Sequence, residues 1–127
     1  MAKEIWKIKG NVFDQFTLKV LHDISNKGHF DELTQALQVG KEANVFIAQK
    51  GSDRVAVKIY RLENCNFNKM FDYIKSDPRF PSIARRKREV VFAWVLREYR
   101  NLLVARQAGV RVPTPLFQKN NVLVEEF

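Results

Sequence analysis

The segment from residue 43 to residue 60 constrains the fold of this chain more than any other, because it has the pattern of two strands joined by a short turn. The connection at residues 49–53 contains Gly51, which suits a hairpin with a bulge or a longer loop. Successive residues of a strand point to opposite faces. One face of residues 55–60 carries Val55, Val57 and Ile59, and the other carries Ala56, Lys58 and Tyr60. The chain is therefore expected to contain an antiparallel sheet.

Helical patterns precede and follow this hairpin. In residues 13–25, apolar side chains recur every three or four positions, Asp14 is placed to cap the start, and Gly28 follows the end. A longer helix is predicted for residues 83–107, where apolar side chains fall within a stripe of roughly 140° on a helical wheel. Those side chains are Val91, Phe92, Val95, Leu96, Tyr99, Leu102 and Leu103. The two helices supply faces that can cover the sheet.

Three further segments complete the pattern. Residues 34–39 predict a short strand, and residues 116–124 predict a second hairpin that turns at two consecutive asparagines. Residues 62–82 are irregular, with the pattern of a short helix near Met70. The order of helix, three strands, long helix and two strands predicts the α+β class with an antiparallel sheet.

The composition fits one soluble globular domain. The chain has 127 residues, of which 46% are hydrophobic and 28% are charged, so a sizeable core is expected. Its longest apolar run, residues 90–96, is too short to span a membrane, and its N-terminus lacks the apolar stretch of a secretory signal. The single cysteine, Cys65, cannot form an internal disulfide, so we expect a reducing compartment, the cytoplasm.

The charge balance indicates phosphate-bearing partners. Twenty-two Lys and Arg residues against 14 Asp and Glu residues leave a net charge of +8. Such a surface favours nucleotides, nucleic acids or an anionic membrane, and charge alone does not choose among them. The basic run RRKR at residues 85–88 is typical of a module that follows an RNA phosphate backbone, and equally of a solvated helix start.

Two charged residues interrupt the apolar patterns. Lys58 lies in the middle of a strand, and Glu98 lies at the edge of the apolar stripe of the long helix. A strand lysine is often an edge residue that prevents aggregation, and Glu98 also fits an ordinary surface glutamate. Alternatively, the two pair with each other, which offsets the cost of partly burying each charge and presents an ammonium group to a polyphosphate.

The turn at residues 39–45 precedes the lysine strand by one hairpin. It contains a single glycine, Gly40, so its backbone approaches a phosphate less freely than a glycine-rich loop does. Lys41 is a candidate to supply positive charge there instead. The alternative is a plain surface turn with solvated side chains.

Seven segments, taken in order, resemble the Rio family of atypical serine/threonine protein kinases, in particular its first, archaeal-type branch. They are GKEANVF at 40–46, VAVKIYR at 55–61, DPRF at 77–80, RRKR…FAW at 85–94, EYRNL at 98–102, AGVRVPTP at 108–115 and NNVLVEEF at 120–127. The lysine strand also matches the third-strand signature of protein kinases.

The resemblance implies a protein-kinase-like N-terminal lobe. This lobe has a five-stranded antiparallel sheet, one long packed helix and an extra N-terminal helix. Residues 1–127 form a single domain under this reading. Its parts are an N-terminal helix region at 1–30, a phosphate-loop hairpin and lysine strand at 33–61, a flexible segment at 62–82, a long helix at 83–108, and a hairpin leading to the hinge at 116–127.

The resemblance also implies the site. Lys58 is expected to contact the phosphates of ATP, with Glu98 as its partner, and both count as catalytic. The residues expected to contact the nucleotide are Gly40, Lys41, Glu42, Ala43, Val45, Ala56, Lys58, Val124 and Glu126. Of these, residues 40–45 form the phosphate loop, Val45, Ala56 and Val124 wall the base, and Glu126 begins the hinge.

The implied reaction is γ-phosphoryl transfer to Ser or Thr of a protein substrate, with a role in maturing the small ribosomal subunit. Its partners are the kinase C-lobe and the small ribosomal subunit or its precursor RNA, and no membrane. Mg²⁺ or Mn²⁺ acts in the full-length enzyme, and no metal ligand is expected in this chain. Because the catalytic loop belongs to the other lobe, the chain is expected to be inactive alone. A non-catalytic pseudokinase lobe is the remaining alternative.

Two positions depart from the family pattern. Gln38 and Val39 replace a Ser-Thr pair before the phosphate loop, which removes hydroxyl contacts to phosphate. Glu125 stands where a methionine is common, before the hinge. A carboxylate at the back of a nucleotide site would repel phosphate unless it points elsewhere.

Overall fold

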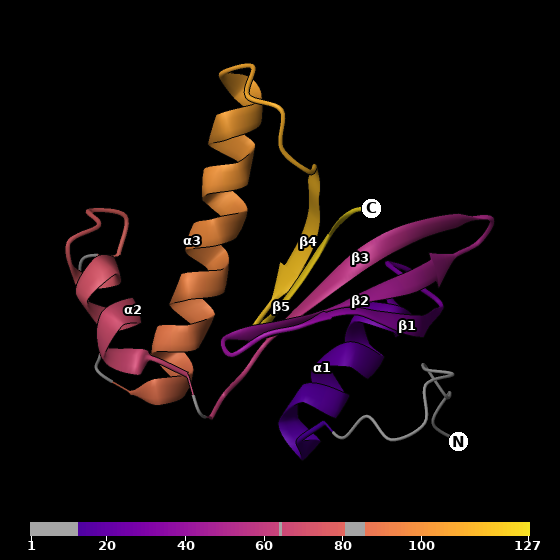
Figure 1. Ribbon diagram of the computed structural model, residues 1–127, viewed down its shortest axis with the longest axis horizontal. Helices are drawn as coiled ribbons and strands as arrows, with labels where there is room; N and C mark the ends of the chain where they lie inside the picture. The colour runs from indigo at the N-terminus through magenta and orange to yellow at the C-terminus, as the bar shows by residue number, and fades with distance from the viewer. Residues whose placement is uncertain (1–12, 64, 81–85) are drawn as a thin grey trace.

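The computed structural model describes residues 13–63, 65–80 and 86–127 and contains a five-stranded antiparallel sheet with helices on both faces (Figure 1). The elements are α1 (Gln15–Asn26), β1 (Glu32–Val39), β2 (Ala43–Lys50), β3 (Asp53–Tyr60), α2 (Phe67–Lys75), α3 (Lys87–Gln107), β4 (Pro115–Lys119) and β5 (Val122–Glu126). The strand order is β1-β2-β3-β5-β4. The predicted α+β class, with its long helix and its extra N-terminal helix, is confirmed.

Helix α1 forms where the sequence places its cap. The Asp14 carboxylate accepts a hydrogen bond of 2.7 Å from the backbone N–H of Thr17, which satisfies one of the free donors at the helix start. Gly28 follows the helix with φ of +87°, a conformation that only glycine adopts at little cost. The buried face of α1 packs its apolar residues Val20, Leu21 and Ile24 against the sheet.

The period-two pattern of β3 divides the core into two parts. On one face, Val55, Val57 and Ile59 join Val122 and Val124 of β5 in the cluster beneath α1. On the other face, Tyr60 and Leu123 join the buried residues of α2 and α3. Figure 1 shows the same arrangement, with α1 on one side of the strands and α2 and α3 on the other.

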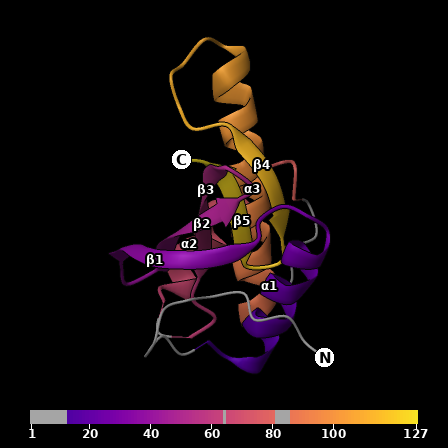
Figure 2. The same ribbon diagram turned by 90° about the vertical axis from the view of Figure 1, so that its right-hand side faces the viewer.

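Helix α3 is bound to the sheet by its first half. Its fully or largely buried residues are Val90, Val91, Ala93 and Val95. The last turns project beyond the sheet, as Figure 2 shows, and Leu103, which was predicted in the apolar stripe, is 36% exposed there. Arg86 occupies the N-cap position, and the predicted helix residues 83–85 lie outside the described residues.

The predicted irregular segment contains helix α2. Asn66 caps it by accepting a 3.1 Å hydrogen bond from the backbone N–H of Lys69. Met70 and Ile74 are buried against α3, as the short apolar pattern indicates. Along the described ranges, no helix is both long and apolar enough to cross a membrane.

Candidate functional site

Lys58 lies in the middle of the sheet. Its strand β3 pairs with β2 on one side and β5 on the other, and the partners of Lys58 in the register are Val45 and Leu123. An edge lysine that blocks strand addition would lie on β1 or β4. The edge-strand interpretation of Lys58 is therefore excluded, and its charge needs another reason.

Glu98 of α3 supplies the partner. Its Oε1 lies 3.1 Å from Nζ of Lys58, and the two side chains are 30% and 27% exposed. Because neither charge is fully buried, the pair keeps one open side. The ammonium group is thus held in place by a carboxylate and remains accessible to an anion from solvent.

Tyr60 is a third member of this group, and the sequence predictions did not include it. Its hydroxyl donates a hydrogen bond to Oε2 of Glu98, the oxygen that Lys58 does not use. Its ring lies 5.1 Å from Nζ of Lys58, within the range of a cation–π contact. The available signal was the alternation in β3, because residues 58 and 60 share a face.

Glu125 lies on the same face, opposite Ala56 in the β3–β5 register. Burial raises the pKa of the Glu125 carboxyl above its ordinary value of 4.5. The ammonium group of Lys58 lowers this pKa and the carboxylate of Glu98 raises it, so both charges act on Glu125. The departure from the family pattern therefore places a second carboxylate near Lys58.

The predicted walls of the base divide between the two faces. Ala56 is 6% exposed and lies on the same face of β3 as Lys58. Val45 is partly exposed and is the partner of Lys58 in the β2–β3 register. Val124 is fully buried in the cluster beneath α1, on the opposite face. The prediction for Val124 is wrong, because one step along a strand reverses the direction of the side chain.

The turn between β1 and β2 is tight at Gly40. A Cβ atom placed there would lie 2.9 Å from the carbonyl oxygen of Ala43, so the turn has no room for a larger residue in its present shape. The N–H of Gly40 donates to that same oxygen over 3.0 Å. Lys41, the next residue, is exposed. The turn is thus compact, with the N–H of Gly40 engaged within the chain and with an exposed cation, Lys41, beside it.

Two predicted contacts are engaged within the chain. Oε2 of Glu42 accepts a 3.1 Å hydrogen bond from the backbone N–H of Asn66, so this carboxylate ties the turn to the start of α2. The backbone N–H of Glu126 donates to the carbonyl oxygen of Thr114 over 2.8 Å. A ligand at the hinge would therefore have to use another backbone group.

Another charged network lies beside this one on α3. The Asp77 carboxylate accepts hydrogen bonds from Arg79 and from Arg97, the latter over 3.2 Å. Arg79 also donates to Asn101 over 2.8 Å. The guanidinium group of Arg79, together with Arg97, holds the pKa of Asp77 far below its ordinary range. The segment DPRF at residues 77–80 thus fastens the end of α2 to α3.

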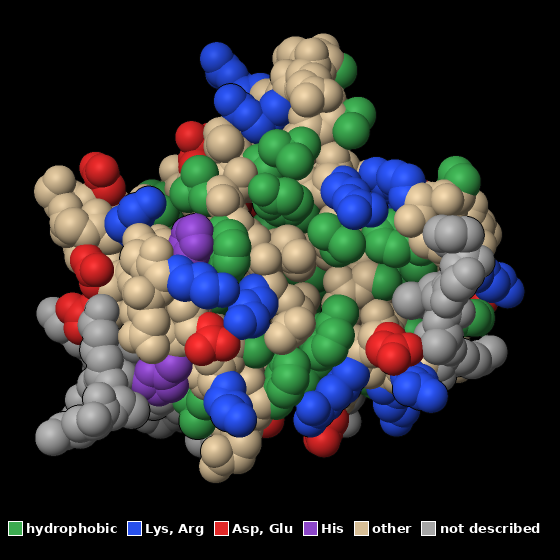
Figure 3. Space-filling model, turned by 180° about the vertical axis from the view of Figure 1, so that it is seen from behind, with side chains coloured by type: hydrophobic (Ala, Val, Ile, Leu, Met, Phe, Trp, Pro, Cys, Tyr) green, Lys and Arg blue, Asp and Glu red, His purple; other side chains and the backbone are tan. Residues whose placement is uncertain are grey.

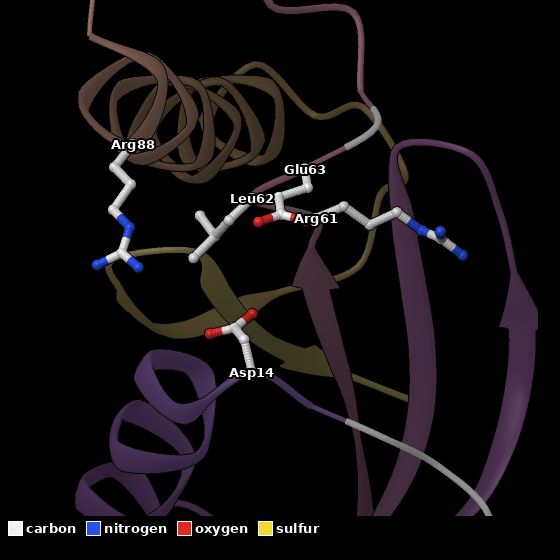
Figure 4. Close-up of a pocket in the computed structure, with 5 residues that line it drawn as sticks. All are labelled: Asp14, Arg61, Leu62, Glu63 and Arg88. Atoms are coloured by element: carbon white, nitrogen blue, oxygen red, sulfur yellow. The ribbon is translucent and has the colours of Figure 1, made fainter.

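A hollow of about 280 Å³ lies at the start of α1, and Lys58 is not among the residues that line it. Figure 4 shows its lining residues, Asp14, Arg61, Leu62, Glu63 and Arg88, which carry charges of both signs. Elsewhere, burial and the nearby Glu42 raise the pKa of the Cys65 thiol to about 11, which disfavours the reactive thiolate form at neutral pH. No cluster of three or more potential metal ligands occurs among residues 13–63, 65–80 and 86–127.

The basic run has local partners. Arg86 pairs with Glu89 at 3.6 Å, Lys87 lies 5.1 Å from the ring centre of Phe67, and Arg88 lies 4.7 Å from that of Phe16. Arg85 lies outside the described residues. The three side chains nevertheless remain exposed, so these contacts leave the run open to an anionic partner.

The comparisons with known proteins agree with this geometry. The chain is 46% identical over 122 residues to the RIO-type serine/threonine-protein kinase Rio1 of Haloferax volcanii, covering 95% of this chain and 42% of that protein. It is 39% identical over 121 residues to Rio1 of Methanocaldococcus jannaschii, covering 95% and 41%. The chain thus spans about two-fifths of the length of these relatives.

A solved structure has the same fold. The crystal structure of the Rio2 kinase–ADP/Mg²⁺–phosphoaspartate complex from Chaetomium thermophilum matches with a TM-score of 0.63 at 19% identity, over 84% of this chain and 31% of that one. Residues 44–127 match the RIO domain family. With an ordered series of matching segments, a lysine–glutamate pair in the middle of the sheet and a family match over most of its length, the chain belongs to the RIO domain family.

Proposed function

We propose that this chain is the ATP-binding N-terminal lobe of a RIO-type serine/threonine protein kinase. The observation that carries the proposal is the partly exposed ion pair of 3.1 Å between Lys58 of β3 and Glu98 of α3. The names of the Rio1 relatives support the activity, and the ADP/Mg²⁺ complex of the Rio2 neighbour supports the nucleotide.

The residues present fit a polyphosphate. Lys58 neutralises and positions the phosphates, and Glu98 holds its ammonium group in one place, so the positive charge costs little reorganisation when phosphate charge develops. The compact turn at Gly40, with Lys41 at its tip, covers the phosphates. Val45 and Ala56 contact the base. Mg²⁺ or Mn²⁺, held by ligands of the C-lobe, would supply positive charge that neutralises the phosphates.

Replacing Lys58 by alanine in the full-length kinase tests this function. We expect kcat to fall at least about 10²-fold, the scale of losing one electrostatic donor, while the fold stays intact. Lys50→Ala is the matched control, because Lys50 is exposed at the far end of the same hairpin. Near wild-type phosphorylation of a protein substrate by Lys58→Ala would refute the function.

We also propose that residues 1–127 alone do not transfer phosphate, and steady ATP turnover by them would refute this.

For the biological partner we propose the small ribosomal subunit or its precursor RNA. The net charge of +8 supports an anionic partner. Figure 3 shows Lys and Arg side chains in separate groups on one face, with acidic and apolar side chains between them. Such a surface suits a large anionic assembly that the protein contacts at several separate places better than it suits one continuous RNA strand. Binding of the full-length kinase to purified small subunits, and its fall with added salt, tests this proposal.

A further inference from the structure

We propose that Tyr60 is a positioning residue for phosphoryl transfer, whose hydroxyl holds the second oxygen of Glu98 so that the first oxygen stays on Lys58. This inference rests on the proposed function and assigns a residue to the same site. Tyr60 is not expected to touch ATP itself. It acts through Glu98, and through Glu98 on the ammonium group of Lys58.

The backbone fixes the position of the Tyr60 ring. The N–H of Tyr60 donates to the carbonyl oxygen of Asn121 over 2.8 Å, and the carbonyl oxygen of Tyr60 accepts from Nδ2 of Asn121 over 3.0 Å. Asn121 is itself fully buried and donates also to Thr17 of α1. Tyr60 is only 3% exposed, so its hydroxyl points to one defined place rather than to solvent.

That place is the free half of the Glu98 carboxylate. A carboxylate has two oxygens, and here each one has its own donor: Lys58 at Oε1 and Tyr60 at Oε2. A glutamate on a helix surface has several rotatable bonds and turns freely when only one oxygen is held. Two donors from one strand, two residues apart, define both the position and the rotation of the carboxylate.

The second carboxylate nearby gives this arrangement a consequence. Glu125 lies on the same face, and its carboxyl feels the charges of both Lys58 and Glu98. If Glu98 turns away, the ammonium group of Lys58 is free to move toward Glu125 and away from the phosphates. The hydroxyl of Tyr60 thus helps to decide which of two carboxylates holds the lysine.

The variant Tyr60→Phe in the full-length kinase tests the inference, because it removes the hydroxyl and keeps the ring. We expect kcat to fall about tenfold, the scale of losing a hydrogen bond to a charged group, with KM for ATP changed less than about threefold. The midpoint of thermal unfolding should stay within a few degrees of wild type. Tyr73→Phe, at a position that is 51% exposed on α2, is the control and should leave kcat unchanged.

A double-mutant cycle with Glu98→Gln separates positioning from simple packing. If the hydroxyl acts through Glu98, adding Tyr60→Phe to Glu98→Gln should cost much less than the tenfold lost in the wild-type background. Independent, multiplicative effects would contradict the proposal. A wild-type kcat for Tyr60→Phe would also contradict it, because the ring alone would then explain the residue. An unfolded Tyr60→Phe protein would contradict it as well, because the hydroxyl would then serve the fold rather than the reaction.

The same set of variants distinguishes this inference from the function on which it rests. Full activity of Lys58→Ala would refute the kinase site itself. An inactive Lys58→Ala enzyme together with a fully active Tyr60→Phe enzyme would refute only the role of Tyr60.

Discussion

Two neighbouring residues of α3 carry two ionic networks that differ in kind. Arg97 bonds to Asp77, whose side chain is only 9% exposed and already holds Arg79 as well. Glu98 bonds to Lys58, and both of these side chains remain about 30% exposed. The first network is closed, with its carboxylate surrounded by guanidinium groups. In the second, a single ammonium group meets a carboxylate that is itself 30% exposed, so the pair has an open side; the cations of the two networks are exposed to a similar degree, 27% for Lys58 against 26% for Arg97 and 35% for Arg79.

The difference teaches how one helix both holds the fold and serves a site. Through Arg97, α3 is fastened to the segment after α2, and through Glu98 it reaches the middle of the sheet. A closed network contributes mainly to the placement of α3. An open one offers a charge to a ligand, and its value appears in binding or turnover more than in stability.

The largest expected effect separates the two networks by activity. Glu98→Gln in the full-length kinase should lower kcat about 10²-fold, because Lys58 loses the charge that fixes it. Asp77→Asn should leave kcat within about threefold, since Asp77 does not contact Lys58 or the phosphates. Steady-state kinetics with ATP and a protein substrate measure both values. Equal losses of kcat would mean that the networks act as one unit.

Stability should show the opposite order. Asp77→Asn is expected to lower the midpoint of thermal unfolding by several degrees, more than Lys58→Ala does, because it loosens α3 from the end of α2. The pKa of Asp77 is lowered in the folded state, so its contribution is present above the ordinary value of 3.8 and is lost as the pH falls through the folded pKa.

The pH dependence offers a check on that assignment. The difference in stability between wild type and Asp77→Asn should be fully present at neutral pH and should shrink under acid conditions, below the ordinary value of 3.8. Thermal unfolding followed by circular dichroism at several pH values measures it. A difference that grows toward acid pH would contradict the closed network described here.

A smaller effect is expected at the phosphate turn. Gly40→Ala should raise KM for ATP several-fold and cost about 1 kcal/mol of stability, because the added Cβ meets the carbonyl oxygen of Ala43 and the turn must shift. Gly51→Ala, in the β2–β3 turn, has no atom within 4 Å of the added Cβ and tests backbone strain alone, through its φ of +59°. Only Gly40→Ala should alter KM for ATP. An equal change of KM in the Gly40→Ala and Gly51→Ala variants would exclude a special role for the β1–β2 turn.

The smallest effect concerns Glu125, which belongs to the open network. Because its folded-state pKa is raised, it favours the folded state below its ordinary value of 4.5, and this contribution is lost as the pH rises through the folded pKa. Glu125→Gln should therefore raise the thermal midpoint slightly at neutral pH and not at pH 4. A lower midpoint at neutral pH would show that Glu125 stabilises Lys58 instead.

The sequence predicted those parts of the molecule that follow from local periodicity. The alternation in β3 placed Lys58 opposite the apolar face, and the helical wheel placed Glu98 at the shoulder of α3; both positions are confirmed. The caps Asp14 and Gly28 are likewise confirmed, since they depend only on neighbouring residues. The pairing of Lys58 with Glu98 was inferred from chemistry, and the structure brings these two side chains together.

Features that depend on register or on distant contacts were missed. Val124 was assigned to the site although one residue of register places it beneath α1. Tyr60 was overlooked because its partner is 38 residues away in sequence, and the role of Asp77 depends on a contact with α3 that no local pattern encodes. Glu42 was assigned to the nucleotide, whereas its carboxylate bonds to the start of α2 in this structure.

The central claim is that Lys58 meets the phosphates of ATP, and its chemical reactivity tests this most directly. The full-length kinase is treated with an amine-reactive reagent with and without a non-hydrolysable ATP analogue, and labelling of Lys58 is followed by mass spectrometry with exposed Lys50 as internal control. At an analogue concentration about ten times its Kd, labelling of Lys58 should slow about tenfold while that of Lys50 is unchanged. Equal labelling of Lys58 with and without the analogue, under conditions where the analogue is bound, would contradict the account.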